Sequence, residues 1–180
     1  MLDVSELRAR TESGERFEYL FFWGHRSEGR VTSTCLSQWY PAGFVVDGVR
    51  YATAEHWMMA GKARLFGDAE HLSKVLEAPD PGAAKKLGRR VRGFEEARWR
   101  EARVGLVTEG NVHKFGQNEA LGRFLADTGE RVLVEASPLD RVWGIGLSVK
   151  NPAHLDPAQW RGENLLGFAL MEARETLRAR

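Results

Sequence analysis

The segment from Tyr51 to Arg64, YATAEHWMMAGKAR, constrains the fold most, because a turn signal and a helix signal meet at its start. Just before it, Asp47-Gly48 stands between β-forming residues, a pattern typical of a type I′ hairpin turn. Thr53 is a residue type that caps helix starts, and the residues after it suit a helix interior. The sequence therefore predicts a hairpin over 44–51 that leads directly into a helix beginning near Thr53.

On this predicted helix, Glu55 and Lys62 leave the same face, because seven residues make two turns less about 20°. Met58 and Met59 lie between them, so a carboxyl and an amine frame an apolar strip. If the strip packs inward, burial disfavours both charged forms, which suits acid–base work and imine formation. The alternative, which spacing alone favours, is a solvated charge pair above a core stripe.

Helical patterns dominate the rest of the chain. We expect helices over 2–11, after Asp68, after Asp80-Pro81, and over 94–112, 118–127 and 162–178. Extended runs are expected over 18–23, 31–40 and 131–135, and a loop punctuated by Gly and Pro over 137–153. Strands and helices do not alternate in the way that builds a parallel sheet. The sequence predicts one domain over 1–180, mainly α with small β ribbons, an α+β fold.

Composition narrows the classes of function. The formal net charge of +1 gives no global field that would recruit nucleic acid or an anionic membrane. A single cysteine, Cys35, excludes an internal disulfide and a cysteine-rich metal site, and the five histidines lack metal-ligand spacing. No apolar segment is long enough to cross a bilayer. We expect a cytoplasmic protein that uses no metal and no membrane, with its oligomeric state left open.

Two aromatic stretches supply candidate binding residues. FFWGH at 21–25 contains Trp23 and Gly24, and SQWYP at 37–41 contains Trp39. These aromatics either fill the core of a hairpin or form a platform for a planar ring. Signatures such as a phosphate-binding glycine loop, G-x-S-x-G or H-E-x-x-H are absent. The residues alone thus indicate a nucleotide-like ligand and no more.

Four further stretches carry candidates. SPLDRVWGIG at 137–146 sets Asp140, Trp143 and Gly144 in a loop, where Asp140 either caps a turn or serves a ligand. Asn164 lies at a helix start, where an N-terminal cap is favoured. Lys114, in KFGQN, either contacts a phosphate or ends a helix. The basic run over 85–92 either tracks a phosphate backbone or is a solvated helix face.

Taken in order, these motifs resemble the NADAR (YbiA-like) family. The matching segments are FFWGH at 21–25, SQWYP at 37–41, VDG at 46–48, AEHWMMAGKA at 54–63, LGRRV at 87–91, the region of Trp99, GNVHKFGQN at 110–118, LVEASPLDRVWGIGL at 133–147 and GENLLGFALMEARE at 162–175. The resemblance covers residues 17–178. It implies a largely helical fold and an N-glycosidase, a hydrolase that needs no cofactor and cleaves the bond between ribose C1′ and nitrogen.

The resemblance implies two substrate types. The first, our leading hypothesis, is a ribosylamino-pyrimidine 5′-phosphate, an early intermediate of the riboflavin pathway. The second is ADP-ribose attached to guanine in DNA or RNA, in which case nucleic acid is a partner as the ADP-ribosylated substrate. A non-catalytic module that binds ADP-ribose or a nucleotide is the third hypothesis, and the presence of both Glu55 and Lys62 argues against it.

The resemblance also assigns residues. Its acid position falls on Glu55 and its attacking lysine on Lys62, so we hypothesise Glu55 as proton-transfer group and Lys62 as nucleophile. Asp140 would hold the ribose hydroxyls or orient Lys62. The paired carboxylates of common glycoside hydrolases are not obvious in the sequence. The expected substrate-binding residues are Trp23, Gly24, Trp39, Trp99, Lys114, Trp143, Gly144 and Asn164, and the candidates for phosphate contacts are Arg26, Lys114, Arg141 and Lys150.

Overall fold

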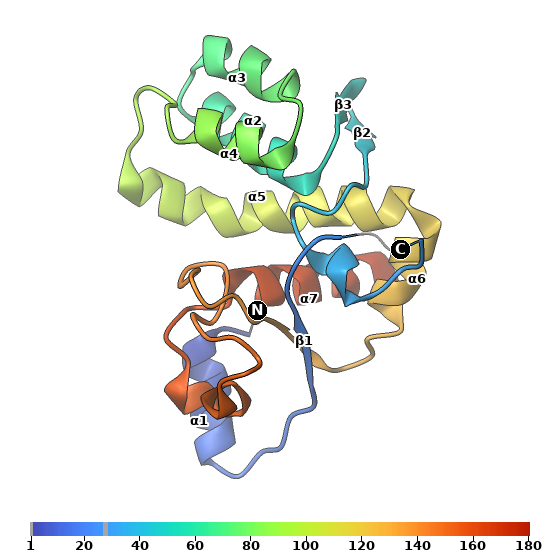
Figure 1. The fold of residues 1–180 in the computed structure, drawn as a ribbon, viewed down its shortest axis with the longest axis vertical. Coiled ribbons are helices and arrows are strands. Elements are labelled where there is room, and N and C mark those ends of the chain that lie inside the picture. Colours follow the sequence, from blue (N-terminus) through green and yellow to red (C-terminus); the bar gives the residue numbers. More distant parts are fainter. Residues whose placement is uncertain (1, 27–28) are drawn as a thin grey trace.

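Helix α5 (Glu96–Gln117) runs between two groups of elements in the computed structural model, which describes residues 2–26 and 29–180 (Figure 1). Helices α2 (Ala54–Leu65), α3 (Ala69–Leu76) and α4 (Pro81–Gly88) form a layer on one side of α5. On the other side, α7 (Leu165–Arg178) packs along α5 and against strand β4 (Val132–Glu135). The remaining helices are α1 (Val4–Glu12), α6 (Glu119–Ala126) and the short 3-10 helices η1 (Ser33–Leu36), η2 (Pro152–Leu155) and η3 (Pro157–Gln159).

The predicted hairpin and the helix start after it are confirmed. Strands β2 (Phe44–Val46) and β3 (Val49–Tyr51) pair antiparallel, and Asp47 and Gly48 between them both have positive φ, as a type I′ turn requires. Thr53 precedes α2, and its side chain accepts a hydrogen bond from the backbone of the first helical turn. The hairpin thus leads directly into α2 and fixes the direction in which that helix begins.

The extended run predicted over 31–40 is wrong. This segment forms η1 and a series of turns, with Cys35 and Leu36 completely buried. Its carbonyl groups turn inward, where the ammonium of Lys114 on α5 donates to the oxygens of Cys35 at 2.6 Å and Ser37 at 2.8 Å. A lysine from a distant helix therefore satisfies the backbone groups that a neighbouring strand would otherwise pair.

Strand β1 (Tyr19–Phe22) pairs in parallel with β4, a pairing that the sequence pattern did not indicate. The two strands come from opposite ends of the chain, and most of the helices lie between them in sequence, so no local βαβ signal marks the pair. In this register Phe22 lies opposite Glu135. The segments that follow the two strands therefore leave from the same edge of the sheet, which is where ligands bind in parallel sheets.

The core forms two buried clusters. The larger one lies among α2, α5 and α7 and includes Trp57, Phe115 and Leu170. The smaller one lies under α1 and the β1–β4 pair and includes Leu7 and Trp160. None of the helices in the described parts of the chain combines the length and apolarity needed to cross a membrane.

Candidate active site

A cavity of about 370 Å³ opens against the inner face of α2. Glu55, Met58, Met59 and Lys62 all line it, so the face of α2 that the sequence singled out faces this cavity. The apolar strip packs inward, with both Met58 and Met59 buried. The geometry therefore favours a carboxyl and an amine at the two ends of a buried apolar strip over a solvated charge pair.

A second cavity, of about 1030 Å³, adjoins the first. Residues that line both are Ser37, Trp39, Lys85, Arg89, Glu135, Asp140 and Val142. The second cavity also receives Trp23, Gly24 and Arg26 after β1, and Leu139 and Arg141 after β4. The two cavities thus form one cleft, from α2 to the carboxyl edge of the β1–β4 pair.

Glu55 is held in a dry position at the start of α2. Its side chain is 3% exposed, and its Oε1 has no hydrogen-bond partner among the described residues. Burial raises the pKa of Glu55 to about 7, and Asp140 adds to this effect. Lys85, a hydrogen bond from Trp39, and Arg89 act in the opposite direction. At neutral pH this carboxyl therefore exists in both protonation states, as an acid–base group requires.

Lys62 lies at the other end of the same helical face. Its Nζ is 4.2 Å from the centre of the Phe94 ring and 5.4 Å from that of Trp99. Burial lowers the pKa of Lys62, and Glu96 acts in the opposite direction. The cation–π contacts favour the ammonium, but the net direction is toward the neutral amine.

Glu135 is a residue of the cleft that the sequence interpretation missed. It ends β4, lines both cavities, and has a buried Oε2 with no hydrogen-bond partner among the described residues. Burial raises the pKa of Glu135 to about 8, Asp140 and Glu55 act in the same direction, and Lys85 opposes them. A second carboxyl therefore shares the cleft with Glu55, although the sequence alone made no such pair obvious. The signal that would have revealed it is the β1–β4 pairing.

Asn164 fixes this strand end, and the N-cap interpretation of its side chain is wrong. It precedes α7 in the left-handed conformation, with φ of 53°, and makes no side-chain capping bond. Its Oδ1 instead accepts a hydrogen bond from the Glu135 N–H at 3.0 Å, and its Nδ2 donates to the Leu133 carbonyl at 2.9 Å. Asn164 therefore supports Glu135 from behind and lies outside both cavities.

Asp140 caps a turn, the first of the two roles that the sequence left open, and its side chain is also accessible from the cleft. Its Oδ1 accepts hydrogen bonds from the backbone N–H groups of Val142 and Trp143, at 2.9 and 2.8 Å, and so closes the loop turn. Its side chain also lines both cavities. The turn therefore holds Asp140 at the junction of the cavities.

The predicted tryptophans are distributed along the cleft. Trp39, Trp99 and Trp143 line the smaller cavity, whereas Trp23 lines the larger one and is 63% exposed. Gly24 follows Trp23 along the wall of the larger cavity. Aromatic faces are thus available at both ends of the cleft.

Two further residues that were predicted to bind the substrate, Lys114 and Gly144, lie outside both cavities. Lys114 is fully buried and donates to backbone carbonyls, so the phosphate contact expected of it is wrong. Gly144 is buried with its Cα against the Glu135 carbonyl, since a Cβ there would approach that oxygen to 2.8 Å. Of the other candidates for phosphate contacts, Arg26 and Arg141 line the larger cavity, whereas Lys150 lines neither.

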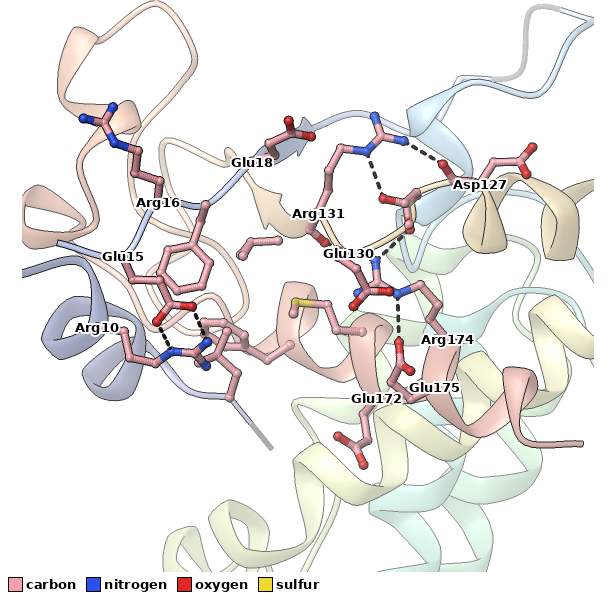
Figure 2. A pocket seen from close by; sticks show the side chains of 17 residues that line it. Arg10, Glu15, Arg16, Glu18, Asp127, Glu130, Arg131, Glu172, Arg174 and Glu175 are labelled. Carbon is pink, nitrogen blue, oxygen red and sulfur yellow. Dashed lines mark hydrogen bonds and ion pairs between the residues drawn. The ribbon is translucent and has the colours of Figure 1, made fainter. Parts of the chain in front are cut away.

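A separate cavity of about 670 Å³ lies at the opposite end of the β1–β4 pair, between α1 and α7 (Figure 2). Its charged groups largely pair with one another or with the backbone. Arg10 pairs with Glu15, Arg174 with Glu175, and Arg131 donates to two backbone carbonyls (Figure 2). None of the candidate residues lines it, and no set of His, Cys, Asp or Glu in the described residues has the arrangement of a metal site.

Comparison with known proteins agrees with this architecture. The NADAR domain family model matches residues 21–178. An N-glycosidase of Acanthamoeba polyphaga mimivirus is 42% identical over 166 residues, which cover 89% of this chain and 97% of that protein. A riboflavin biosynthesis protein of Vibrio vulnificus is 32% identical over 79% of this chain, but the match spans only 35% of that protein.

Solved structures agree as well. The NMR structure of the Escherichia coli protein YbiA superimposes with a TM-score of 0.72 at 24% identity, covering 92% of this chain and 88% of that one, which shows a shared fold. In sequence, the Escherichia coli N-glycosidase YbiA is 29% identical over 73% of this chain and 74% of its own length. The chain belongs to the NADAR family, and it is an N-glycosidase, a hydrolase of N-glycosyl bonds.

Proposed function

We propose that this N-glycosidase hydrolyses the C1′–N bond of ribosylamino-pyrimidine 5′-phosphates, early intermediates of the riboflavin pathway. The observation that carries the proposal is the shared cavity of Glu55 and Lys62, in which burial moves both side chains toward their neutral forms. The name of the Vibrio vulnificus relative, a riboflavin biosynthesis protein, supports the same class of substrate.

Lys62 is the nucleophile in this proposal. A ribosylamine opens to an imine, and a neutral amine exchanges into imines, so an amine with a lowered pKa suits attack at C1′. Glu55 is the proton-transfer group, because a carboxyl with a pKa of about 7 both accepts and donates protons near neutrality. Asp140 is suited to hold the ribose hydroxyls, since one of its oxygens is engaged by the loop and its side chain still lines the cavities.

The cleft also offers contacts for the rest of the substrate. Trp143 and Trp99 line the smaller cavity and provide faces against which a pyrimidine stacks. Arg26 and Arg141, in the larger cavity, are the proposed partners of the 5′-phosphate. Because Lys114 is buried elsewhere, it has no part in this recognition.

Removal of ADP-ribose from guanine in nucleic acid is the second candidate function. The size of the adjoining cavity, about 1030 Å³, favours it, because a pyrimidine riboside phosphate does not need that volume. The exposed ring of Trp23 at this end suits stacking by a second base. Restoration of unmodified guanine on an ADP-ribosylated oligonucleotide would establish this activity.

The decisive experiment is mass spectrometry of the protein after incubation with each substrate type and borohydride. We expect a sugar adduct on Lys62 of the wild type, absent from Lys62→Ala and retained in Lys86→Ala, which removes an exposed lysine of α4. The mass of the adduct identifies the substrate. Turnover without an adduct would remove Lys62 from the chemistry and leave Glu55 to activate water directly. Affinity with neither adduct nor turnover would instead indicate a non-catalytic nucleotide-binding module.

A further inference from the structure

Glu135 has no role in the reaction outlined above, although its side chain is placed much like that of Glu55. Glu135 Oε2 and Glu55 Oε1 are both buried, and neither has a hydrogen-bond partner in the described parts of the chain. Both side chains line the 370 Å³ cavity. An unpaired buried carboxyl oxygen is costly, so two in one cavity indicate a site that a ligand with hydrogen-bond donors completes.

The backbone of Glu135 is fixed on both sides. Its N–H donates to Asn164 Oδ1 at 3.0 Å, and its carbonyl accepts a hydrogen bond from the Ile145 N–H at 2.9 Å. Its strand neighbour is Phe22, after which the chain turns into the larger cavity. Glu135 is therefore held at the junction of the two cavities, where a bond that joins two halves of a substrate would lie.

The charged groups that share this cavity with Glu135 come from three helices and two connecting segments. The charged residues that line the same cavity are Glu55 and Lys62 of α2, Lys85 of α4, Arg89 just after α4, Glu96 and Arg103 of α5, and Asp140 of the loop after β4. Like charges in one dry site resist simultaneous ionisation, so the two glutamates lose their protons at different pH. Burial raises the pKa of both carboxyls, that of Glu55 to about 7 and that of Glu135 to about 8. Glu55 shares the α2 face with Lys62, whereas Glu135 lies at the junction of the two cavities, so Glu55 is placed beside the nucleophile and Glu135 beside the departing group.

We propose that Glu135 donates a proton to the departing nitrogen, while Glu55 accepts the proton that the attacking nucleophile releases. This inference rests on the function proposed above. The C1′–N bond breaks with its electron pair going to nitrogen, which takes the proton of Glu135. Where water attacks directly, instead of Lys62, a bond forms between C1′ and the oxygen of water, and the proton of that water passes to Glu55. Return of a proton from Glu55 to Glu135 restores the starting state.

The route through Lys62 also balances. Its amine attacks C1′ and releases a proton to Glu55; water then attacks C1′, its hydroxyl group stays on that carbon, and its remaining proton passes to the departing Lys62 amine. In both routes one carboxyl must be ionised and the other protonated, the division of labour found in glycoside hydrolases that use two carboxyls. In this chain one member of the pair lies on a helix and the other at the end of a parallel strand.

The test is the pH dependence of kcat in Glu135→Gln with a ribosylamino-pyrimidine 5′-phosphate. We expect kcat to fall by about 100-fold or more, with a smaller change in KM, and the alkaline fall of the profile to disappear. Glu135→Asp should restore that alkaline fall at a reduced rate. The matched control Glu18→Gln, at an exposed position just before β1, should keep the wild-type profile. An alkaline fall retained in Glu135→Gln would overturn the assignment.

A second measurement needs no substrate. Titration of the glutamate δ-carboxyl carbons by ¹³C NMR should show that Glu55→Gln lowers the pKa of Glu135, because the Glu55 carboxylate raises it, whereas an unchanged pKa would overturn the proton pair. Wild type without turnover but with this coupling would refute the proposed substrate and leave the pair standing. Turnover without coupling would refute the pair and leave the proposed function standing. Melting curves by circular dichroism establish that each variant is folded.

Discussion

Replacing Glu55 by glutamine should stabilise the protein at alkaline pH and have little effect near pH 4.5. Burial raises the pKa of Glu55 from its ordinary value of 4.5 to about 7. In the unfolded chain the carboxyl ionises at its ordinary pKa, so between these two values unfolding releases a proton and stability falls as pH rises. Above about pH 7 the carboxyl is ionised in both states, and the accumulated penalty stays constant.

The separation of the two pKa values corresponds to about 3 kcal/mol of unfolding free energy. Glutamine is neutral at every pH, so Glu55→Gln removes this penalty where it exists. Any cost of the unpaired amide is the same at both ends of the range and cancels in the comparison. For a chain of this size, about 3 kcal/mol raises the melting temperature by roughly 6–12 °C.

Urea unfolding of wild type and Glu55→Gln at pH 5 and pH 8.5 measures the effect. We expect the variant to gain about 2–3 kcal/mol relative to wild type between the two conditions. The control Glu18→Gln alters an exposed carboxyl and should show no comparable gain. A difference between wild type and Glu55→Gln that is the same at both pH values would refute the reasoning, because it would show that Lys85 and Arg89 fully offset the burial of the charge.

Two further substitutions test how the site is supported. Gly167→Ala should destabilise by about 3 kcal/mol in urea unfolding, because its Cβ would lie 2.0 Å from the backbone oxygen of Leu133, whereas Gly105→Ala on α5, with open space around it, should be neutral or slightly stabilising. Lys114→Met should lose about 1–3 kcal/mol, because the Cys35 carbonyl loses its lysine partner and the Ser37 carbonyl keeps only its bond from the Tyr40 N–H; it should also speed hydrogen exchange of the Glu55 N–H, which donates to the Gln38 carbonyl. Equal stability of the two glycine variants, or unchanged exchange at Glu55, would contradict these accounts.

The parts of the fold that could be predicted from sequence are those set by near neighbours in the chain. Asp47-Gly48 needs only its own positive φ angles, and the caps at Thr53 and Asp80 need only the backbone of the next turn. The shared face of Glu55 and Lys62 follows from helix geometry alone. These local rules do not depend on where the rest of the chain lies, so they held.

The features that were missed depend on contacts between distant segments. The run over 31–40 has a strand-like composition, but Lys114 on α5 satisfies its carbonyls and keeps it turned. Asn164 resembles a helix cap, but its amide pairs with β4 instead of with its own helix. In each case a polar side chain far away in sequence competes with the local pattern and satisfies the backbone groups.

The same distinction separates the two glutamates of the cleft. Glu55 could be singled out because helix periodicity assigns it a face. Glu135 becomes a candidate only once it is known that β1 pairs with β4 and that the segments after both strands line one cleft. A carboxyl at a strand end is unremarkable in sequence, and the burial that raises its pKa comes from elements that the local sequence does not contain. A second carboxyl in such a site therefore has to be sought by its topology, at the carboxyl edge of a parallel pair, before any motif is expected to reveal it.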